Sequence, residues 1–266
     1  MDKIDKKEKK LNVFVNQEIY RSDYEENIRK DFINLFNDNP IPDEDLLQNL
    51  GLFLNSKNLS RILFMDHIYK KIIDTQGIII EFGCRWGQNI SIFSALRGIY
   101  EPFNRHRKIV GFDTFEGFPS LTDKDNTDVE MMTEGGLACT KDYEKYLCKI
   151  MEYQEADNPM SHVKKFDIVK GDAIVKLEEY LKEYPETIIS MAYFDFDIYE
   201  PTKKCLELIL PHLFEGSVLG FDELNDIDSP GETLALNEVF GLNNIKLERY
   251  RYTSRTSYFT YGGRKC

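Results

Sequence analysis

The sequence has no apolar run long enough to cross a membrane and no apolar segment behind its charged start. A membrane-spanning helix needs about 20 consecutive apolar residues, and none occurs within the 266 residues. The opening stretch, MDKIDKKEKK, is charged and lacks the apolar region that a signal peptide carries. We therefore expect a cytoplasmic protein with no membrane insertion.

Positive charge is also scarce. The chain has 34 Lys and Arg against 46 Asp and Glu, so its formal net charge is −12. Nucleic-acid binding needs a positive surface that displaces counterions, so nucleic acid is not an expected partner. The five cysteines are an odd number without a CxxC pair or a zinc-like spacing, which favours an ordinary protein with reduced thiols.

The N-terminal part has a helical pattern. Aromatic and aliphatic residues recur every four positions from Tyr20 to Phe36, which predicts a helix over about 17–36. Two more helices are predicted over DLLQNLGLFLNS and LSRILFMDHIYKKII, the second with Ser60 as its N-cap. We expect residues 1–74 to form a helical cap or lid over a domain at 75–266, and this part is compatible with a homodimer.

The second domain alternates strands with helices. The segments GIIIEFG, KIVGFDTF, FDIVKGDA, TIISMAYFDFD and GSVLGFDEL read as buried strands, each followed by a helix. The C-terminal IKLERYRYTSRTSYFTYGG alternates apolar with polar residues and reads as two further strands. The fold class is therefore α/β, with a mostly parallel, seven-stranded Rossmann-like sheet that ends in an antiparallel hairpin. The segment 119–163 is expected as a lid insertion.

Acidic residues end each of the five predicted parallel strands. Ligands of such sheets bind outside the carboxyl ends of the strands, so these side chains are expected to share one crevice. A solvated acidic edge is the alternative reading. The acids are Glu81, Asp113, Asp172, Asp195 with Asp197, and Asp222 with Glu223.

The first strand leads into a glycine turn of the form E-x-G-x-x-x-G, made by Glu81, Gly83 and Gly87. A dinucleotide-binding turn has three glycines and holds a pyrophosphate, which an acid at position 81 would repel. An acid suits a ligand with positive charge, such as the sulfonium and amino groups of S-adenosylmethionine. A plain strand-to-helix turn is the alternative, and Cys84 within it reads more readily as packing than as a nucleophile.

Asp113 can accept hydrogen bonds from a ribose diol, although it can equally cap the turn that follows. Asp172 can lie beside the adenine or act as the N-cap of the next helix. The candidate cofactor-binding residues are Glu81, Gly83, Cys84, Gly87, Asn89, Asp113, Thr114, Gly171, Asp172 and Ala173.

Four segments carry a resemblance to a known family: EFGCRWG, VGFDTFEGFP, FDFDIYEPT and GSVLGFDEL. Together they resemble the macrocin O-methyltransferase family, over about 78–240. The resemblance implies a class I methyltransferase fold, S-adenosylmethionine as methyl donor, a sugar hydroxyl as acceptor and help from Mg²⁺. It also implies cofactor contacts at Glu81, Gly83 and Asp113, and a metal held by Asp195, Asp222 and Glu223.

Residue chemistry supports the metal site independently. Asp195 and Asp222 close adjacent strand positions, and such hard oxygen ligands suit Mg²⁺ or Mn²⁺ rather than zinc. The family usually has Asp-Asp where this chain has Asp222-Glu223, and the longer Glu side chain can still reach a metal. Asp197 is either a neighbour of the ligands or a ligand in place of Asp195.

The expected reaction is metal-dependent methylation of a sugar, nucleotide-linked or glycosidic, for a surface polysaccharide or a natural product. Asp195 or Asp197 is the expected proton acceptor, and His162 is a further catalytic candidate. The basic loop Arg105–Lys108 either holds phosphates of a nucleotide sugar or is solvated, and the solvated reading is favoured. The alternative function is a metal-independent N-methyltransferase of an amino sugar.

Overall fold

The structure is a computed structural model that describes residues 23–262. The N-terminal arm and the first part of the helix predicted over 17–36 lie outside the described residues. The chain divides into two compact units, 1–60 and 61–266. Each unit is described by itself.

The described part of the first unit, from residue 23 on, is mainly helical, as its sequence pattern predicts. It contains α2 (Asp23–Asn37), the single turn α3 (Asp43–Leu46) and the 3₁₀ helix η2 (Leu47–Phe53). The rings of Phe36 and Phe53 meet edge to face with centroids 4.8 Å apart. Helix α4 (Ser56–Tyr69) begins four residues before the predicted start at Ser60. That prediction is wrong because Asn55 provides the cap, its Oδ1 accepting the N–H of Asn58 at 2.8 Å.

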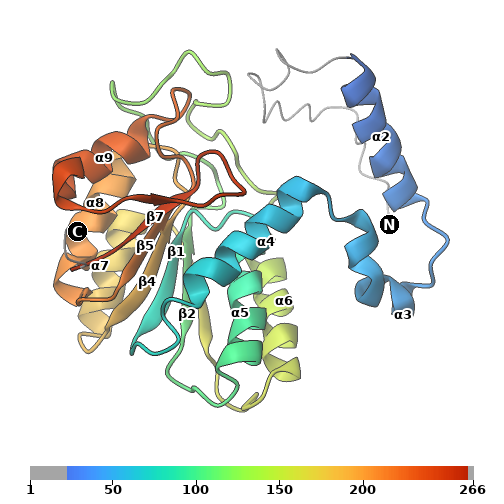
Figure 1. Cartoon of the computed structure of the whole chain (residues 1–266), viewed down its shortest axis with the longest axis horizontal. Coiled ribbons are helices and arrows are strands. Elements are labelled where there is room, and N and C mark those ends of the chain that lie inside the picture. Colours follow the sequence, from blue (N-terminus) through green and yellow to red (C-terminus); the bar gives the residue numbers. More distant parts are fainter. Residues whose placement is uncertain (1–22, 263–266) are drawn as a thin grey trace. The chain divides into compact units, whose positions relative to one another are not determined.

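The second unit is built on a seven-stranded sheet with the order β3-β2-β1-β4-β5-β7-β6 (Figure 1). Strands β1 to β5 are parallel, and β7 pairs antiparallel with both β5 and β6. The predicted mostly parallel sheet with a C-terminal antiparallel hairpin is confirmed. The strands are β1 (Ile78–Phe82), β2 (Ile109–Asp113), β3 (Phe166–Lys170), β4 (Ile189–Phe194), β5 (Val218–Phe221), β6 (Glu248–Arg249) and β7 (Ser257–Thr260).

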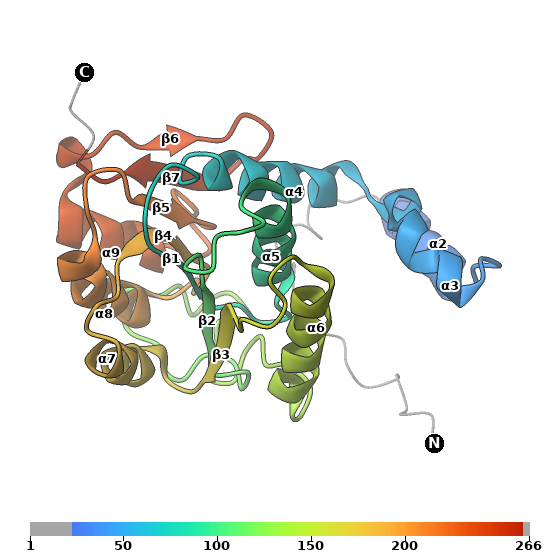
Figure 2. The ribbon, with the colours of Figure 1, turned by 90° about the horizontal axis from the view of Figure 1, so that it is seen from below.

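Helices cover both faces of this sheet. Figure 2 shows α7, α8 and α9 on one side and α5 and α6 on the other. Alternate strand residues feed the two apolar layers, so Ile80 and Phe82 pack in one and Ile79 in the other. Within residues 23–262 no helix is both long and apolar enough to span a membrane. The helices are α5 (Gln88–Tyr100), α6 (Tyr143–Asp157), α7 (Ala173–Glu183), α8 (Tyr199–Ile209), η3 (Leu210–His212), α9 (Gly231–Phe240) and η4 (Leu242–Asn244).

The strand order reverses between β1 and β4. From β1 the chain moves outward through β2 to β3, whereas β4 and β5 extend the sheet in the other direction. Helices that follow β1 and β4 therefore leave on opposite faces, which opens a crevice at the carboxyl ends of these two strands. The candidate site residues are those that border this crevice.

The segment between β2 and α6 is anchored to the loop that follows β4. Phe118 and Met132 pack with Ile198 in a small apolar cluster. Asp125 is buried, and its Oδ1 accepts the N–H of Tyr199 at the start of α8 at 2.7 Å. The segment therefore forms a wall beside the loop that carries Asp195 and Asp197. Its predicted role as a lid, like that of the N-terminal cap, stays a prediction.

The basic loop Arg105–Lys108 lies directly before β2, at the amino-terminal ends of the parallel strands. The acids lie at the opposite, carboxyl ends. Arg107 is fully buried and donates to the carbonyl oxygens of Gly77 at 2.6 Å and Ile72 at 2.8 Å. Its Nε also contacts Glu101 at 2.9 Å. Arg107 is therefore neither solvated nor available to phosphates. Its guanidinium is buried at the amino-terminal ends of the strands, where it binds backbone carbonyl groups.

We expect Arg107→Met to destabilise the fold strongly. Removing one partner of a buried ion pair leaves an uncompensated charge and costs about 3–5 kcal/mol, here on Glu101. Arg105→Ala, at an exposed position of the same loop, is the control and should change the free energy of unfolding by less than about 0.5 kcal/mol. Urea unfolding midpoints measure both, and equal midpoints for the two variants would contradict this account of Arg107.

Candidate active site

The turn after β1 lies directly against the backbone of the loop after β4. Gly83 has φ +80°, and a Cβ built on it would lie 2.0 Å from the carbonyl oxygen of Asp195. Gly87 has φ +76° at the N-cap of α5, and its Cβ would lie 2.3 Å from a methyl carbon of Leu147. Only glycine fits either position. Gly83 thus lets the turn after β1 approach the loop after β4, whereas Gly87 lets the start of α5 pack against Leu147 of α6.

Glu81 is a buried acid with half of its hydrogen-bonding capacity unused. Its side chain is 1% exposed, and Oε1 accepts a hydrogen bond from Asn89 at 2.9 Å. Oε2 has no partner among the described residues. Burial raises the pKa of Glu81 to about 8. A positively charged ligand would stabilise the ionised form of Glu81. The sequence predicts a ligand of this charge at this position.

Asp113 ends the neighbouring strand β2 and holds the glycine turn. It accepts the backbone N–H of Arg85 at 2.7 Å and that of Phe115 at 2.5 Å. Burial raises the pKa of Asp113, and the charge of Asp113 adds to the rise in the pKa of Glu81. The two acids therefore face one region, although Asp113 also caps its own turn. Thr114 is used locally, with its hydroxyl donating to the Gly117 carbonyl at 2.7 Å.

The remaining cofactor candidates have structural roles in this arrangement. Asp172 is the N-cap of α7, and its Oδ1 accepts the N–H groups of Ile174 and Val175 at 2.8 and 3.3 Å. Gly171 has φ +137°, and Ala173 is buried as the first residue of α7. Cys84 packs in the apolar layer below the turn. Contact of these four residues with a cofactor stays a prediction.

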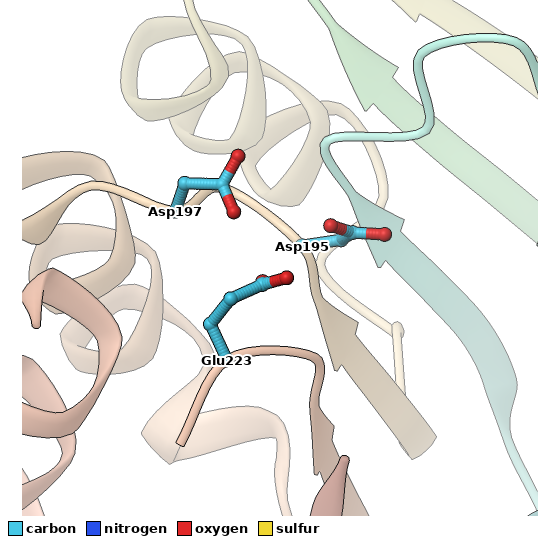
Figure 3. Close-up of side chains that lie close together, drawn as sticks. All are labelled: Asp195, Asp197 and Glu223. Atoms are coloured by element: carbon cyan, nitrogen blue, oxygen red, sulfur yellow. The ribbon is translucent and has the colours of Figure 1, made fainter. Parts of the chain in front are cut away.

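An acidic cluster lies across the crevice, at the ends of β4 and β5. Carboxylate oxygens of Asp195, Asp197 and Glu223 all lie within 4.8 Å of one another. Figure 3 shows the three side chains converging, Asp195 and Asp197 from the loop after β4 and Glu223 from the loop after β5. Asp197 and Glu223 are buried, whereas Asp195 is partly exposed.

Mutual repulsion and burial act on all three groups. Burial raises the pKa values of Asp195, Asp197 and Glu223, and the charge of Asp222 raises each further. Glu223 Oε2 is buried without a hydrogen-bond partner among the described residues. Converging hard oxygens with an unsatisfied buried atom are a donor set that fits Mg²⁺ or Mn²⁺.

Asp222 has a different environment from its neighbours. Arg61 donates to its Oδ2 at 2.8 Å, and the hydroxyl of Tyr193 donates to its Oδ1 at 2.6 Å. Burial would raise the pKa of Asp222, but Arg61 and the hydrogen bonds outweigh it and hold the pKa at about 2. Asp222 is therefore ionised at neutral pH, and it does not belong to the three-carboxylate cluster of the described residues.

Glu232 fixes the two acidic loops in place. It is fully buried at the start of α9, and its Oε1 accepts the N–H groups of Phe196 at 3.0 Å and Asp197 at 3.4 Å. Its Oε2 accepts the N–H of Glu223 at 3.2 Å. One side chain thus ties the loop after β4 to the loop after β5. Asp197 has φ +63°, a left-handed conformation that such contacts help to maintain.

Glu232, Arg61 and Arg255 belong to the site as well, although none of them lies in the motifs that predict it. Arg255 pairs with Glu223 at 2.8 Å and with Asp226 at 2.9 Å. Of these three residues, only Glu232 could have been noticed in the sequence, because it is an acid in the first turn of a predicted helix. His162 is not brought to the site, because it is exposed in the turn before β3 begins, at the opposite end of that strand.

Comparison with solved structures finds, among others, two structures of one protein, CalS11, and one of a second protein, NovP. CalS11, a calicheamicin methyltransferase, is 38% identical with a TM-score of 0.89, covering 99% of this chain and 100% of that one. An apo structure of CalS11, named there as a TDP-rhamnose 3′-O-methyltransferase of calicheamicin biosynthesis, is 36% identical with a TM-score of 0.80, covering 91% and 96%. The O-methyltransferase NovP is 16% identical with a TM-score of 0.57, covering 75% and 78%, and shows the fold alone.

No protein-family model and no curated protein sequence matches the chain. The sheet order and the acid-bearing glycine turn define a class I methyltransferase that depends on S-adenosylmethionine. Within that class, the chain belongs to the same methyltransferase family as CalS11.

We expect the affinity for S-adenosylmethionine to rise with pH up to about 8, where Glu81 titrates. Below its pKa Glu81 must release a proton before it can neutralise a cation, so affinity gains up to about tenfold per pH unit. Calorimetry at several pH values measures this effect. Glu81→Gln should lose most of the dependence, and an unchanged slope in that variant would contradict the assignment.

We expect Glu232→Gln to lower the rate of methyl transfer while S-adenosylmethionine still binds. The amide nitrogen cannot accept an N–H, so one loop loses its anchor, at a cost of about tenfold to a hundredfold in rate. Glu207→Gln, at an exposed position of α8 where Glu207 pairs with Lys204 at 3.3 Å, is the control. Steady-state kinetics should show the loss in kcat. An equal loss in both variants would mean that only helix stability matters.

Proposed function

We propose that this enzyme transfers the methyl group of S-adenosylmethionine to a hydroxyl of a sugar carried by a nucleoside diphosphate. The product would serve the biosynthesis of a glycosylated natural product. The observation that carries the proposal is the 38% identity to CalS11 over nearly the whole of both chains. The function named for CalS11, a TDP-rhamnose 3′-O-methyltransferase, supplies the class of acceptor. The macrocin-type motifs support a sugar hydroxyl as well.

A divalent cation is part of this proposal, because the acidic cluster fits one. Asp195 and Glu223 would hold it, together with Asp222, whose pKa of about 2 keeps the charge that a ligand needs. Arg61 neutralises Asp222 in this structure and would compete with a cation for that carboxylate. When bound, the cation would supply a Lewis acid that lowers the pKa of the acceptor hydroxyl.

Asp197 is the proposed proton acceptor. Burial raises its pKa, which makes it a stronger base than Asp222, and it lies in the same cluster as Asp195 and Glu223. Its carboxylate would take the hydroxyl proton while the acceptor oxygen bonds to the methyl carbon and the carbon–sulfur bond breaks. Glu232 would hold Asp197 in position through the backbone N–H. Glu81 would neutralise positive charge on the methyl donor.

Incubation with S-adenosylmethionine, Mg²⁺ and TDP-rhamnose should yield a methylated sugar nucleotide, detected by mass spectrometry. A panel of other nucleotide-linked sugars tests the acceptor class, and EDTA should abolish turnover. Methylation of an amino sugar that persists in EDTA would favour the metal-independent N-methyltransferase instead.

Two variants test the proposed roles separately, Asp222 as a metal ligand and Asp197 as the proton acceptor. Asp222→Asn should weaken Mg²⁺ activation at least about tenfold. Asp197→Asn should lower kcat by about 100-fold or more at saturating Mg²⁺. If instead Asp197→Asn weakened Mg²⁺ activation and Asp222→Asn lowered kcat at saturating Mg²⁺, Asp197 would be the metal ligand and Asp222 the proton acceptor.

A further inference from the structure

Three arginines lie at the acidic edge of the sheet, and two of them are already neutralised. Arg61 pairs with Asp222, and Arg255 pairs with Glu223 and Asp226. Arg85 forms no ion pair with another described residue, and its Nε is buried without a hydrogen-bond partner. A charge-carrying donor with unused capacity, in a site built for substrates, calls for an anionic ligand.

Arg85 stands beside an exposed aromatic surface. Its guanidinium carbon lies 5.8 Å from the ring centre of Trp86, which is 42% exposed and is the chain's single tryptophan. The Tyr143 ring meets Trp86 edge to face at 4.7 Å, and the Tyr143 hydroxyl donates to the Trp86 carbonyl at 3.0 Å. The turn after β1 and the start of α6 thus hold an aromatic face next to a guanidinium that forms no ion pair within residues 23–262.

The backbone of Arg85 has a strained conformation. Its φ is +43°, in the left-handed region that few residues other than glycine adopt. The Asp113 carboxylate maintains it by accepting the Arg85 N–H at 2.7 Å. Two residues earlier, Gly83 touches the backbone of Asp195. Arg85 therefore projects from a turn that contacts both the methyl-donor side and the acidic loop.

An acidic protein needs a local positive group to hold a diphosphate, since its net charge of −12 repels one. The basic loop before β2 cannot serve, because Arg107 is buried and Lys108 pairs with Asp167 at the opposite edge. A guanidinium matches phosphate oxygens, and an exposed aromatic ring stacks on a nucleobase. We propose that Arg85 and Trp86 form the subsite for the nucleoside diphosphate part of the acceptor. This inference rests on the proposed function.

The methyl donor also carries an anion, the carboxylate of its methionine part, which a guanidinium recognises by the same chemistry. Two ligands separate the two sources. Thymidine diphosphate presents the phosphates without a reactive sugar, and S-adenosylhomocysteine presents the carboxylate. Both are titrated into the full-length protein by calorimetry, and quenching of Trp86 fluorescence reports on stacking because no other tryptophan contributes.

We expect saturable binding of thymidine diphosphate with quenching of Trp86. In Arg85→Gln the dissociation constant for thymidine diphosphate should rise about tenfold to a hundredfold, while that for S-adenosylhomocysteine changes less than about threefold. Arg85→Lys should recover part of the affinity, since it keeps the charge but not the planar fork. Arg105→Gln, in the loop at the opposite edge, is the matched control and should bind as the wild type.

Unchanged binding of thymidine diphosphate in Arg85→Gln, or no binding to the wild type, overturns the subsite. A selective loss of S-adenosylhomocysteine binding also overturns it and assigns Arg85 to the methionine carboxylate. Retained S-adenosylhomocysteine binding shows that the variant is folded. Binding is measured without turnover, so a failure to methylate any nucleotide sugar would refute the proposed function and leave the subsite intact.

Discussion

The fold concentrates negative charge at one buried edge, and the rest of the site depends on how that charge is balanced. Parallel strands end side by side, so the acids at or just beyond the carboxyl ends of β1, β2, β4 and β5 face one crevice. Burying like charges together is unfavourable unless cations or hydrogen bonds offset them. The protein offsets part of the cost with Arg61, Arg255 and three N–H groups directed at Glu232. The methyl donor and the proposed cation would offset the remainder.

The neutralisation is uneven, and the unevenness separates roles among similar residues. Asp222 receives an arginine and a tyrosine hydroxyl and stays ionised, whereas Asp197 receives neither and has a raised pKa. A permanent anion suits a ligand, and a carboxylate with a raised pKa suits a base. Similarly, Arg61 and Arg255 form ion pairs inside the protein, whereas Arg85 forms none with another residue of the described range 23–262. Function here follows from which charges lack a partner.

The sheet and the acids that end its strands were predictable because both are local in sequence. Apolar runs closed by Glu81, Asp113 or Asp195 indicate the strand and its end at once, and a parallel sheet then places the ends together. Partners from distant segments were not predictable. Arg61 comes from α4, and no local pattern announces that its guanidinium reaches Asp222, 161 residues away. The same limit hid the burial of Arg107 within a charged loop, since its partners Gly77 and Ile72 lie about thirty residues earlier.

Arg61, on α4, lies against the carboxylates of the proposed cation site. Arg61 is the first residue of the second compact unit, and it follows directly on the first unit within the same helix. Its guanidinium contacts Asp222 and lies 3.6 Å from Asp195, two carboxylates of the proposed cation site. Because a cation and Arg61 would neutralise the same acids, occupation of one disfavours the other. Any shift of Arg61 relative to Asp222 would therefore change the affinity of the proposed site for a cation.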